Sequence, residues 1–293
     1  MDRTGIGGRS VVMEIGIFSR TYEKTSLEEV LQQMTEDGIF HSQLNLASAG
    51  LPSLPEAVED ERIEEIRALH ERYHVTVDAL SGTFNMIDPD PDARRRHISQ
   101  FALQCRIARH LGAPMVTLCT GSRHPKDRWA WHEDNLSDAA WADLLRTTEA
   151  ILPLAEENDV RLGVEPEVNN IICSALMARR YLDEMKSDRI GIIMDAANLF
   201  HPGEEARMRE MIDSAFDLLG ENITLAHAKD FMPAETVNRM CGPGQGILDF
   251  PSVIARLRSC GYEGPLIMHG MGAEDAAGCA GYLRDLLQGK DRR

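Results

Sequence analysis

Four apolar, β-rich segments each end in a carboxylate or an imidazole. The motifs GVEPE, IMDAAN, AHAKD and IMHG place Glu165, Asp195, His227 and His269 at such ends. Carboxylate oxygen and imidazole nitrogen bind Mn²⁺, Zn²⁺, Co²⁺ or Fe²⁺, and carboxylates also suit Mg²⁺. Two anionic and two neutral ligands would balance a divalent ion and leave positions for two substrate oxygens. A capping or core role could explain any one of these residues, but it explains four of them less well.

Further polar residues lie beside these four. Lys229 follows His227 by two positions, so strand alternation points both side chains the same way. Lys229 could neutralise a substrate alkoxide or hold a ligand carboxylate, or it could form an ion pair with Asp230. Asp230 should face away from the site, where it would orient His227 or anchor the next loop. Glu167 shares the face of Glu165 and could orient a ligand or bind a hydroxyl group.

Two segments predicted as loops carry residues that could contact a substrate. CTGSRHPKDRWAWHEDN contains Arg123, His124 and Trp129, and SGTFNMIDPD contains Asn85. An indole stacks on the apolar face of a sugar, and arginine binds hydroxyl or phosphate oxygens. We therefore expect a substrate lid, although a loop that folds over itself is the alternative. The segment HSQLN also offers Asn45, which could reach the same rim or simply pack.

These residues need a fold that collects strand ends at one rim. Eight β-rich runs occur at about residues 12–18, 39–46, 75–81, 114–120, 160–165, 190–195, 223–228 and 265–269. They alternate with amphipathic segments at residues 26–38, 60–73, 91–112, 137–158, 174–186, 205–220, 251–261 and 274–287. This alternation predicts a single-domain α/β protein, a (β/α)8 TIM barrel with its active site at the C-terminal strand ends. A doubly wound sheet is the alternative, but FSRTYEKTS lacks the glycine-rich turn which that fold places after the first strand.

Composition narrows the class of protein further. The net charge of −16 would repel nucleic-acid phosphates, so we expect no nucleic-acid partner. No apolar run approaches the roughly 18–20 residues of a membrane span, and six cysteines without a CxxC pair suggest reduced thiols. We expect a cytoplasmic protein with no membrane contact. Residues 1–10 are interpreted as a disordered lead and residues 11–290 as the barrel.

The strand-end motifs resemble those of a known family. GVEPE, IMDAAN, HAKD, GQGILDF and GYEGPLIMH are similar to segments of the sugar phosphate isomerase/epimerase group of xylose isomerase-like TIM barrels. By this resemblance, Glu165, Asp195 and His227 match metal ligands on strands five, six and seven. The strand-eight ligand of the epimerases is usually a glutamate, whereas this chain has His269. Asn198 stands where the endonuclease branch of the superfamily has a further histidine, which argues against DNA as a substrate.

The resemblance implies a divalent-metal-dependent isomerase or epimerase of a small sugar, keto-sugar or cyclitol, acting through a metal-stabilised enediolate. Glu165 would be the base, and His269 or another rim group would return the proton. Lys229 would assist by neutralising a substrate alkoxide. The expected substrate-binding residues are Glu167, Asn198, Arg123, His124, Trp129 and Asn85. A metal-dependent lyase or dehydratase, a subunit of a glycoside-cleaving hetero-oligomer and a non-catalytic sugar-binding barrel are the alternatives. Barrels of this family are often dimers or tetramers, so the resemblance is also compatible with a homo-oligomer.

Overall fold

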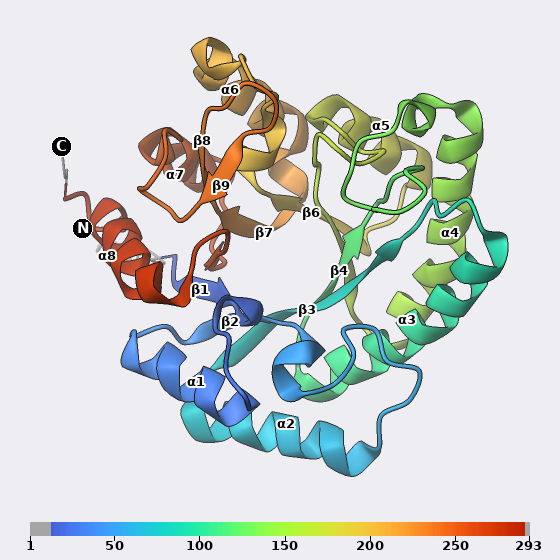
Figure 1. The fold of residues 1–293 in the computed structure, drawn as a ribbon, viewed down its shortest axis with the longest axis horizontal. Coiled ribbons are helices and arrows are strands. Elements are labelled where there is room, and N and C mark those ends of the chain that lie inside the picture. Colours follow the sequence, from blue (N-terminus) through green and yellow to red (C-terminus); the bar gives the residue numbers. More distant parts are fainter. Residues whose placement is uncertain (1–12, 291–293) are drawn as a thin grey trace, which may run out of the picture.

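The computed structural model describes residues 13–290, and the predicted lead over residues 1–10 lies outside this range. Eight parallel strands close into a barrel in the order β1-β10-β7-β6-β5-β4-β3-β2 (Figure 1). The predicted TIM barrel is therefore confirmed, and the sheet is not open. The strands are β1 Ile15–Phe18, β2 His41–Leu44, β3 Thr76–Asn85, β4 Met115–Cys119, β5 Arg161–Val164, β6 Ile190–Met194, β7 Ile223–Ala228 and β10 Leu266–Met268.

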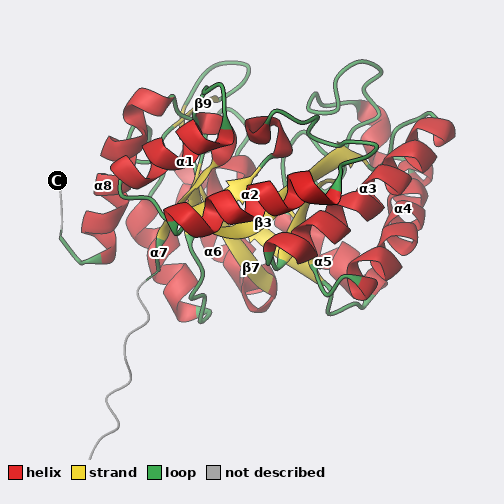
Figure 2. Cartoon of the chain, turned by 90° about the horizontal axis from the view of Figure 1, so that it is seen from below, coloured by secondary structure: helices red, strands yellow, loops and turns green. Residues whose placement is uncertain are grey.

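Eight α-helices surround these strands (Figure 2). They start and end close to the predicted positions because local capping signals define their ends. Helix α3, for example, begins after the N-cap Asp90 with Pro91 in its first turn, and it ends at Gly112, whose φ is +72°. The helices are α1 Leu27–Glu36, α2 Asp60–Tyr73, α3 Pro91–Leu111, α4 Asp138–Glu157, α5 Ala175–Met185, α6 Met208–Leu219, α7 Phe250–Ser259 and α8 Ala276–Leu287.

A small apolar layer fills the barrel interior and forms the floor of its C-terminal half. The side chains of this layer are Ala79, Met115, Ile193, Leu225 and Ile267. Strand side chains alternate between two faces, so residues two positions further along also point into the barrel. Those residues are Ser81, Thr117, Asp195, His227 and His269. On five strands, therefore, a polar residue follows an apolar floor residue by two positions.

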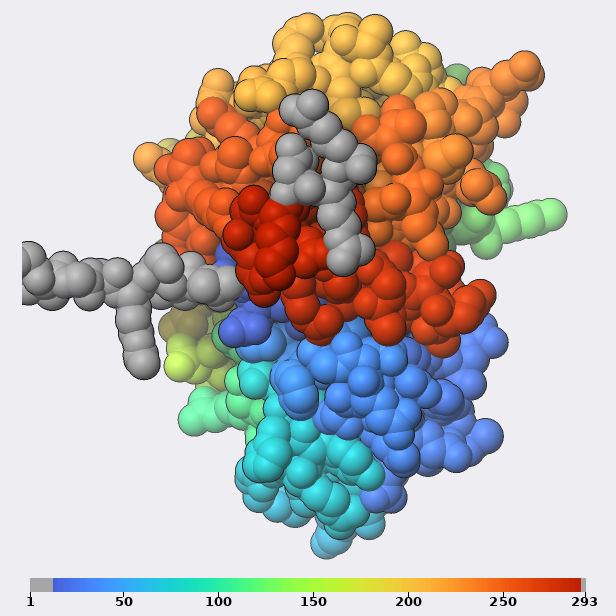
Figure 3. Space-filling model, turned by 90° about the vertical axis from the view of Figure 1, so that its left-hand side faces the viewer, coloured from blue at the N-terminus to red at the C-terminus, as the bar shows by residue number. Residues whose placement is uncertain are grey.

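The pairing of β1 with β10 closes the barrel. Gly16 is the register partner of Ile267. Arg284 of α8 also donates a hydrogen bond of 2.6 Å to the carbonyl oxygen of Gly38, which follows α1. Figure 3 shows α8, in red, lying against the N-terminal part of the chain, in blue. Closure therefore places β1 and β2 beside β10 and β7.

The connection after β7 contains a hairpin that the sequence did not predict. Strands β8 (Asp230–Met232) and β9 (Arg239–Cys241) pair in antiparallel register. The carboxylate of Asp230 accepts hydrogen bonds from the backbone N–H groups of Gly244, Gly246 and Leu248. Of the two predicted roles of Asp230, the structure supports loop anchoring. Within residues 13–290, no helix combines the length and the apolar character that crossing a membrane requires.

Candidate metal centre and substrate pocket

A cavity of about 260 Å³ opens at the C-terminal ends of the barrel strands. Seventeen residues line it, and they come from the ends of the strands and the loops that follow them. They are Phe18, Gln43, Asn45, Ser81, Thr83, Thr117, Leu118, Cys119, Thr120, Trp129, Glu165, Glu167, Asn170, Asn198, His227, Lys229 and His269.

The structure brings the four predicted metal ligands together. Glu165, Asp195, His227 and His269 each offer one ligand atom, and these atoms all lie within 4.8 Å of one another. His269 Nε2 lies 2.9 Å from Asp195 Oδ2, and the two imidazole rings meet edge to face with their centroids 4.6 Å apart. Four residues separated by up to 104 positions in the sequence thus form one cluster because each lies at or next to the C-terminal end of its barrel strand.

The hydrogen bonding of His227 tests whether the cluster suits a cation. Gln43 Nε2 donates to Ser81 Oγ, which leaves Gln43 Oε1 to accept from His227 Nε2 at 2.8 Å. His227 Nδ1 is buried and has no hydrogen-bond partner among the described residues. This nitrogen faces Glu165 Oε1 at 3.4 Å and Asp195 Oδ2 at 3.9 Å. A nitrogen lone pair directed at two carboxylates requires a positive charge between them, so the cluster fits a divalent cation.

Lys229 holds one carboxylate of the cluster. Its Nζ lies 3.1 Å from Asp195 Oδ2 and donates to Asn198 Oδ1 at 2.6 Å. Burial opposes ionisation of both Lys229 and Asp195. Their mutual attraction outweighs it, so the pKa of Lys229 is raised and the pKa of Asp195 is lowered. The ion pair is therefore with Asp195 and not, as the alternative held, with Asp230.

Asn198 connects Lys229 with Glu165. Its Nδ2 donates to Glu165 Oε1, while its Oδ1 accepts from Lys229. The side chain also lines the pocket, where the predicted role in substrate binding would place it. Its two hydrogen bonds show that it also orients the carboxylate of Glu165.

Glu167 is half-buried at the pocket wall. Asn170 Nδ2 donates to its Oε2 at 3.0 Å. Burial and repulsion by the nearby Glu165 raise the pKa of Glu167 to about 7. A carboxyl group at this position can bind a hydroxyl group either as a donor or as an acceptor.

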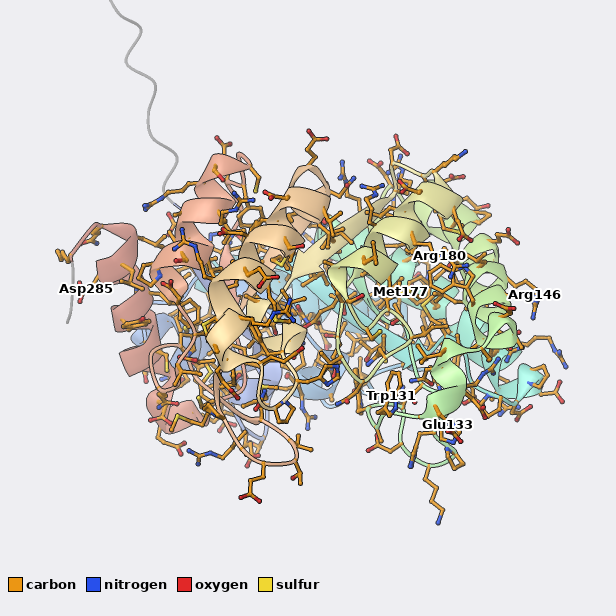
Figure 4. The ribbon with its side chains drawn as sticks, turned by 90° about the horizontal axis from the view of Figure 1, so that it is seen from above. Trp131, Glu133, Arg146, Met177, Arg180 and Asp285 are labelled. Carbon is orange, nitrogen blue, oxygen red and sulfur yellow. The ribbon has the colours of Figure 1, made fainter. Side chains whose placement is uncertain are left out.

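The loop between β4 and α4 contributes less to the pocket than the sequence suggested. Trp129 lines the pocket, but Arg123, His124 and Asn85 do not. Arg123 instead forms an ion pair with Asp143 of α4, at 2.5 Å. In Figure 4 this loop, which carries Trp131 and Glu133, projects to the same side of the molecule as the β8–β9 hairpin.

His124 and Asn85 have structural roles in the same region. His124 Nδ1 accepts from the backbone N–H of Asp127 at 3.0 Å. Asn85 exchanges hydrogen bonds with the backbone of Ser122 at 2.7 and 3.2 Å. Arg123, His124 and Asn85 therefore stabilise the loop, and we do not propose them as substrate-binding residues.

Sequence reasoning missed the polar residues of the early strands. Gln43, Ser81 and Thr117 line the pocket, and Gln43 contacts His227 directly. Asn45 also reaches the rim, one of the two outcomes considered for it. The available signal was the alternation along these strands, in which an apolar floor residue precedes Ser81 and Thr117 by two positions. Uncharged residues are common in strands, so this signal did not stand out.

Fold and site together define a (β/α)8 barrel with a candidate metal centre at the C-terminal rim. The chain belongs to the xylose isomerase-like TIM barrel family, whose model matches residues 45–285. No curated protein sequence matches the chain.

Solved structures with the same fold cover nearly the whole chain. A 3-keto-D-glucoside 4-epimerase from E. coli has 18% identity and a TM-score of 0.72, with 93% of this chain and 99% of that chain covered. A D-psicose 3-epimerase from Clostridium cellulolyticum, in a structure with D-tagatose, has 15% identity, a TM-score of 0.72 and coverage of 94% and 99%. The IolI protein with a zinc atom has 16% identity, a TM-score of 0.75 and coverage of 96% and 100%. At such identities the likeness establishes the fold alone.

Proposed function

We propose that this chain is a divalent-metal-dependent isomerase or epimerase of a small sugar, keto-sugar or cyclitol. The observation that carries the proposal is the cluster of Glu165, Asp195, His227 and His269, three of which line a closed-bottomed pocket. The epimerases among the structures with the same fold support the reaction class, and the zinc atom in the IolI structure supports a metal cofactor.

In this proposal Glu165, Asp195, His227 and His269 hold the metal. A bound divalent cation acts as a Lewis acid towards the oxygens of a bound carbonyl compound. Gln43 fixes the His227 tautomer that presents Nδ1 to the centre. Lys229 keeps Asp195 ionised and in place through their ion pair.

The proton transfer is assigned to residues that face the substrate. Glu165 lines the pocket, and its orientation is held by the Asn198 amide. Glu165 would remove a proton from a substrate carbon, and His269 or another rim group would return a proton to carbon and so form the product. Lys229 also lines the pocket and can donate to a substrate oxygen that becomes more negative during the reaction.

One departure from the family's usual pattern favours three alternative functions. His269 replaces the glutamate that the epimerases usually carry on the last strand, so one expected acid–base group is absent. A dehydratase, a subunit of a glycoside-cleaving hetero-oligomer or a sugar-binding barrel without catalysis would need no second glutamate. These alternatives predict binding of a sugar, but no interconversion of free sugars by the purified chain.

Metal content tests the centre. Wild-type protein purified without chelators should hold about one Mn, Zn, Co, Fe or Mg ion per chain by mass spectrometry, and His269→Ala should hold much less. If His269→Ala retained its metal, His269 would not be a metal ligand. It would instead contact the substrate or orient Asp195. No metal in the wild type, even after soaking, would reject the metalloenzyme.

Glu165→Gln tests the proton transfer. The variant should lose roughly 10²- to 10⁴-fold in kcat on any keto-sugar that the wild type interconverts, because a positioned general base contributes about this much. Glu210→Gln, which changes an exposed carboxylate on α6, is the matched control. Full activity of metal-loaded Glu165→Gln would show that another group removes the proton.

A further inference from the structure

The pocket has two chemically different halves. Strands β5 to β10 and the loops after them supply all of its ionisable acids, imidazoles and the single ammonium group, namely Glu165, Glu167, His227, Lys229 and His269. Strands β1 to β4 supply neutral side chains. They are Phe18, Gln43, Asn45, Ser81, Thr83, Thr117, Leu118, Cys119 and Thr120, to which the loop after β4 adds Trp129; the later half also contains the neutral Asn170 and Asn198. The halves face each other across the barrel, with the early strands in blue to green and the late strands in yellow to red (Figure 1).

Neutral polar groups on three neighbouring strands lie side by side. Ser81 of β3 is the register partner of Thr117 of β4. Leu44 of β2 is the register partner of Leu80, so the following residues Asn45 and Ser81 lie at the same level. We call the set Asn45, Ser81, Thr83 and Thr117 the hydroxyl wall. It faces the candidate metal centre from the opposite side of the pocket.

Two of these four residues, Thr117 and Asn45, have unused hydrogen-bonding capacity. The Thr117 hydroxyl is buried and has no partner among the described residues. Asn45 uses its Oδ1 to accept from the Ala47 N–H and the Ser53 hydroxyl, while no described residue bonds to its amide N–H groups. Buried polar groups without partners are rare in folded proteins, because each costs free energy that a partner restores. Thr117 is such a group and lines the pocket, and beside the free amide of Asn45 it indicates a ligand with matching hydroxyl groups.

The charges around the pocket argue against a ligand that carries a phosphate or a carboxylate. Among the residues described, Lys229 is the only lysine or arginine that lines the pocket, and its ammonium group is paired with Asp195. The arginines of the nearby β4–α4 loop are engaged elsewhere. Arg123 pairs with Asp143, and Arg128 donates to the Thr83 carbonyl from outside the pocket lining. A phosphate or carboxylate on the substrate would lie beside Glu165, Glu167 and Asp195 without an arginine to bind it.

We propose that the hydroxyl wall binds the hydroxyl groups of an uncharged polyol chain or ring, so that the substrate is a neutral sugar or cyclitol and not a sugar phosphate or sugar acid. This inference rests on the proposed function in one respect, namely that the pocket is the substrate site. The cavity of about 260 Å³ lies just below the roughly 300–1,000 Å³ of pockets for drug-sized ligands, which suits a single monosaccharide.

Paired probes test the charge preference. Isothermal titration calorimetry on the Mn²⁺-loaded full chain would compare D-tagatose and D-fructose with their 6-phosphates. The neutral sugars should bind at least about 10-fold more tightly than the phosphate esters, since an unpaired anion beside carboxylates is repelled. Equal or tighter binding of either ester, or no binding of both neutral sugars, would overturn the inference.

Single substitutions test the wall itself. Thr117→Val keeps the shape of the side chain and removes the unpartnered hydroxyl, so it should weaken binding of the neutral sugar roughly 3- to 10-fold. Thr83→Val should act in the same direction. Ser42→Ala is the matched control, since it removes a buried, unpartnered hydroxyl on β2 that does not line the pocket, and it should leave binding unchanged.

Unchanged affinity for the neutral sugar in both Thr117→Val and Thr83→Val, with correct folding shown by circular dichroism, would overturn the proposal that the hydroxyl wall binds the substrate. Metal content and sugar turnover of the wild type report separately on the proposed function. A protein that binds metal and interconverts sugars but prefers the phosphate esters would keep the proposed function and lose this inference. A protein that binds neutral sugars through Thr117 without turnover would keep this inference and lose the proposed function.

Discussion

His227 shows how one residue depends on both halves of the barrel. Its Nδ1 faces Glu165 and Asp195, while its Nε2 donates to Gln43, which lies 184 positions away in the sequence. A metal-binding histidine usually donates its second nitrogen to such an acceptor, because that bond fixes the tautomer and the ring orientation. Gln43 is therefore a positioning residue for the candidate metal centre.

Replacing Gln43 should weaken metal binding without removing a ligand. We expect Gln43→Leu to lower the metal affinity roughly 10- to 100-fold, measured by competition with a chromophoric chelator. Gln43→Glu keeps an oxygen acceptor for His227 Nε2 and should retain most of the affinity. Unchanged affinity in Gln43→Leu would mean that the barrel packing alone orients His227.

At the scale of elements, the loops at the C-terminal rim are held by buried carboxylates. Asp143 of α4 pairs with Arg123, and Asp230 of β8 accepts backbone hydrogen bonds from the loop at residues 242–248. Asp230 is 1% exposed, and two of the N–H groups that it binds belong to buried residues, Phe231 and Leu248. A buried N–H group that loses its acceptor lowers the free energy of unfolding by about 1–3 kcal/mol.

Asp230→Ala should therefore destabilise the protein strongly. We expect the free energy of unfolding to fall by about 3 kcal/mol or more, because the buried N–H groups of Phe231 and Leu248 lose their partner. Urea denaturation monitored by circular dichroism would measure the change. Glu210→Ala removes an exposed carboxylate paired with Arg207 and should cost less than about 0.5 kcal/mol. A small effect of Asp230→Ala would mean that the loop finds other acceptors.

The pairing of β2 with β3 contains an ion pair that responds to pH. His41 Nδ1 lies 3.0 Å from Asp78 Oδ2, and this hydrogen bond raises the pKa of His41. The folded state then holds its proton more tightly than the unfolded chain, whose histidine pKa is near 6.5. The stabilisation is fully present below that value and is lost as the pH rises through the higher pKa of the folded state.

His41→Gln should consequently cost more stability at pH 5.5 than at pH 9. Urea unfolding of the wild type and the variant at both pH values measures the two differences. His201→Gln changes an exposed histidine and serves as the control. An equal cost of His41→Gln at both pH values would show that packing, and not the charge, determines the contribution of His41.

At the scale of the whole molecule, closure of the barrel depends on a close approach of its two ends. A Cβ atom at Gly16 would lie 2.4 Å from Ile267 Cδ1 and 3.0 Å from the His41 backbone oxygen. The absence of a side chain therefore lets β1 fit between β2 and β10. Without this fit, Gln43 and His269 would not flank the same pocket.

Two glycine substitutions test separately how close packing and helix propensity affect the stability of the protein. Gly16→Ala should destabilise the protein by roughly 1–3 kcal/mol, since it overpacks the interior. Gly278→Ala lies in α8, where the new Cβ would meet nothing within 4 Å, and should stabilise the protein by about 0.5–1 kcal/mol. Thermal and urea denaturation of both variants measure these changes. Tolerance of Gly16→Ala would show that Ile267 can change rotamer without loss.

The sequence by itself determined the eight strands, the eight helices and the strand-end positions of Glu165, Asp195, His227 and His269. It could do so because side-chain alternation, apolar periodicity and capping depend on residues close together in the chain. The β8–β9 hairpin escaped prediction because its strands are only three residues long.

Only the tertiary structure decided which polar groups meet. Arg123 lies in a loop near the pocket, yet its guanidinium is bound by Asp143, 20 positions later in a helix. Lys229 pairs with Asp195 of the neighbouring strand end and not with the adjacent Asp230. Gln43 reaches His227 because barrel closure brings β2 and β7 to opposite sides of one narrow interior. Such contacts depend on the register and closure of the whole barrel, which no local pattern in the sequence encodes.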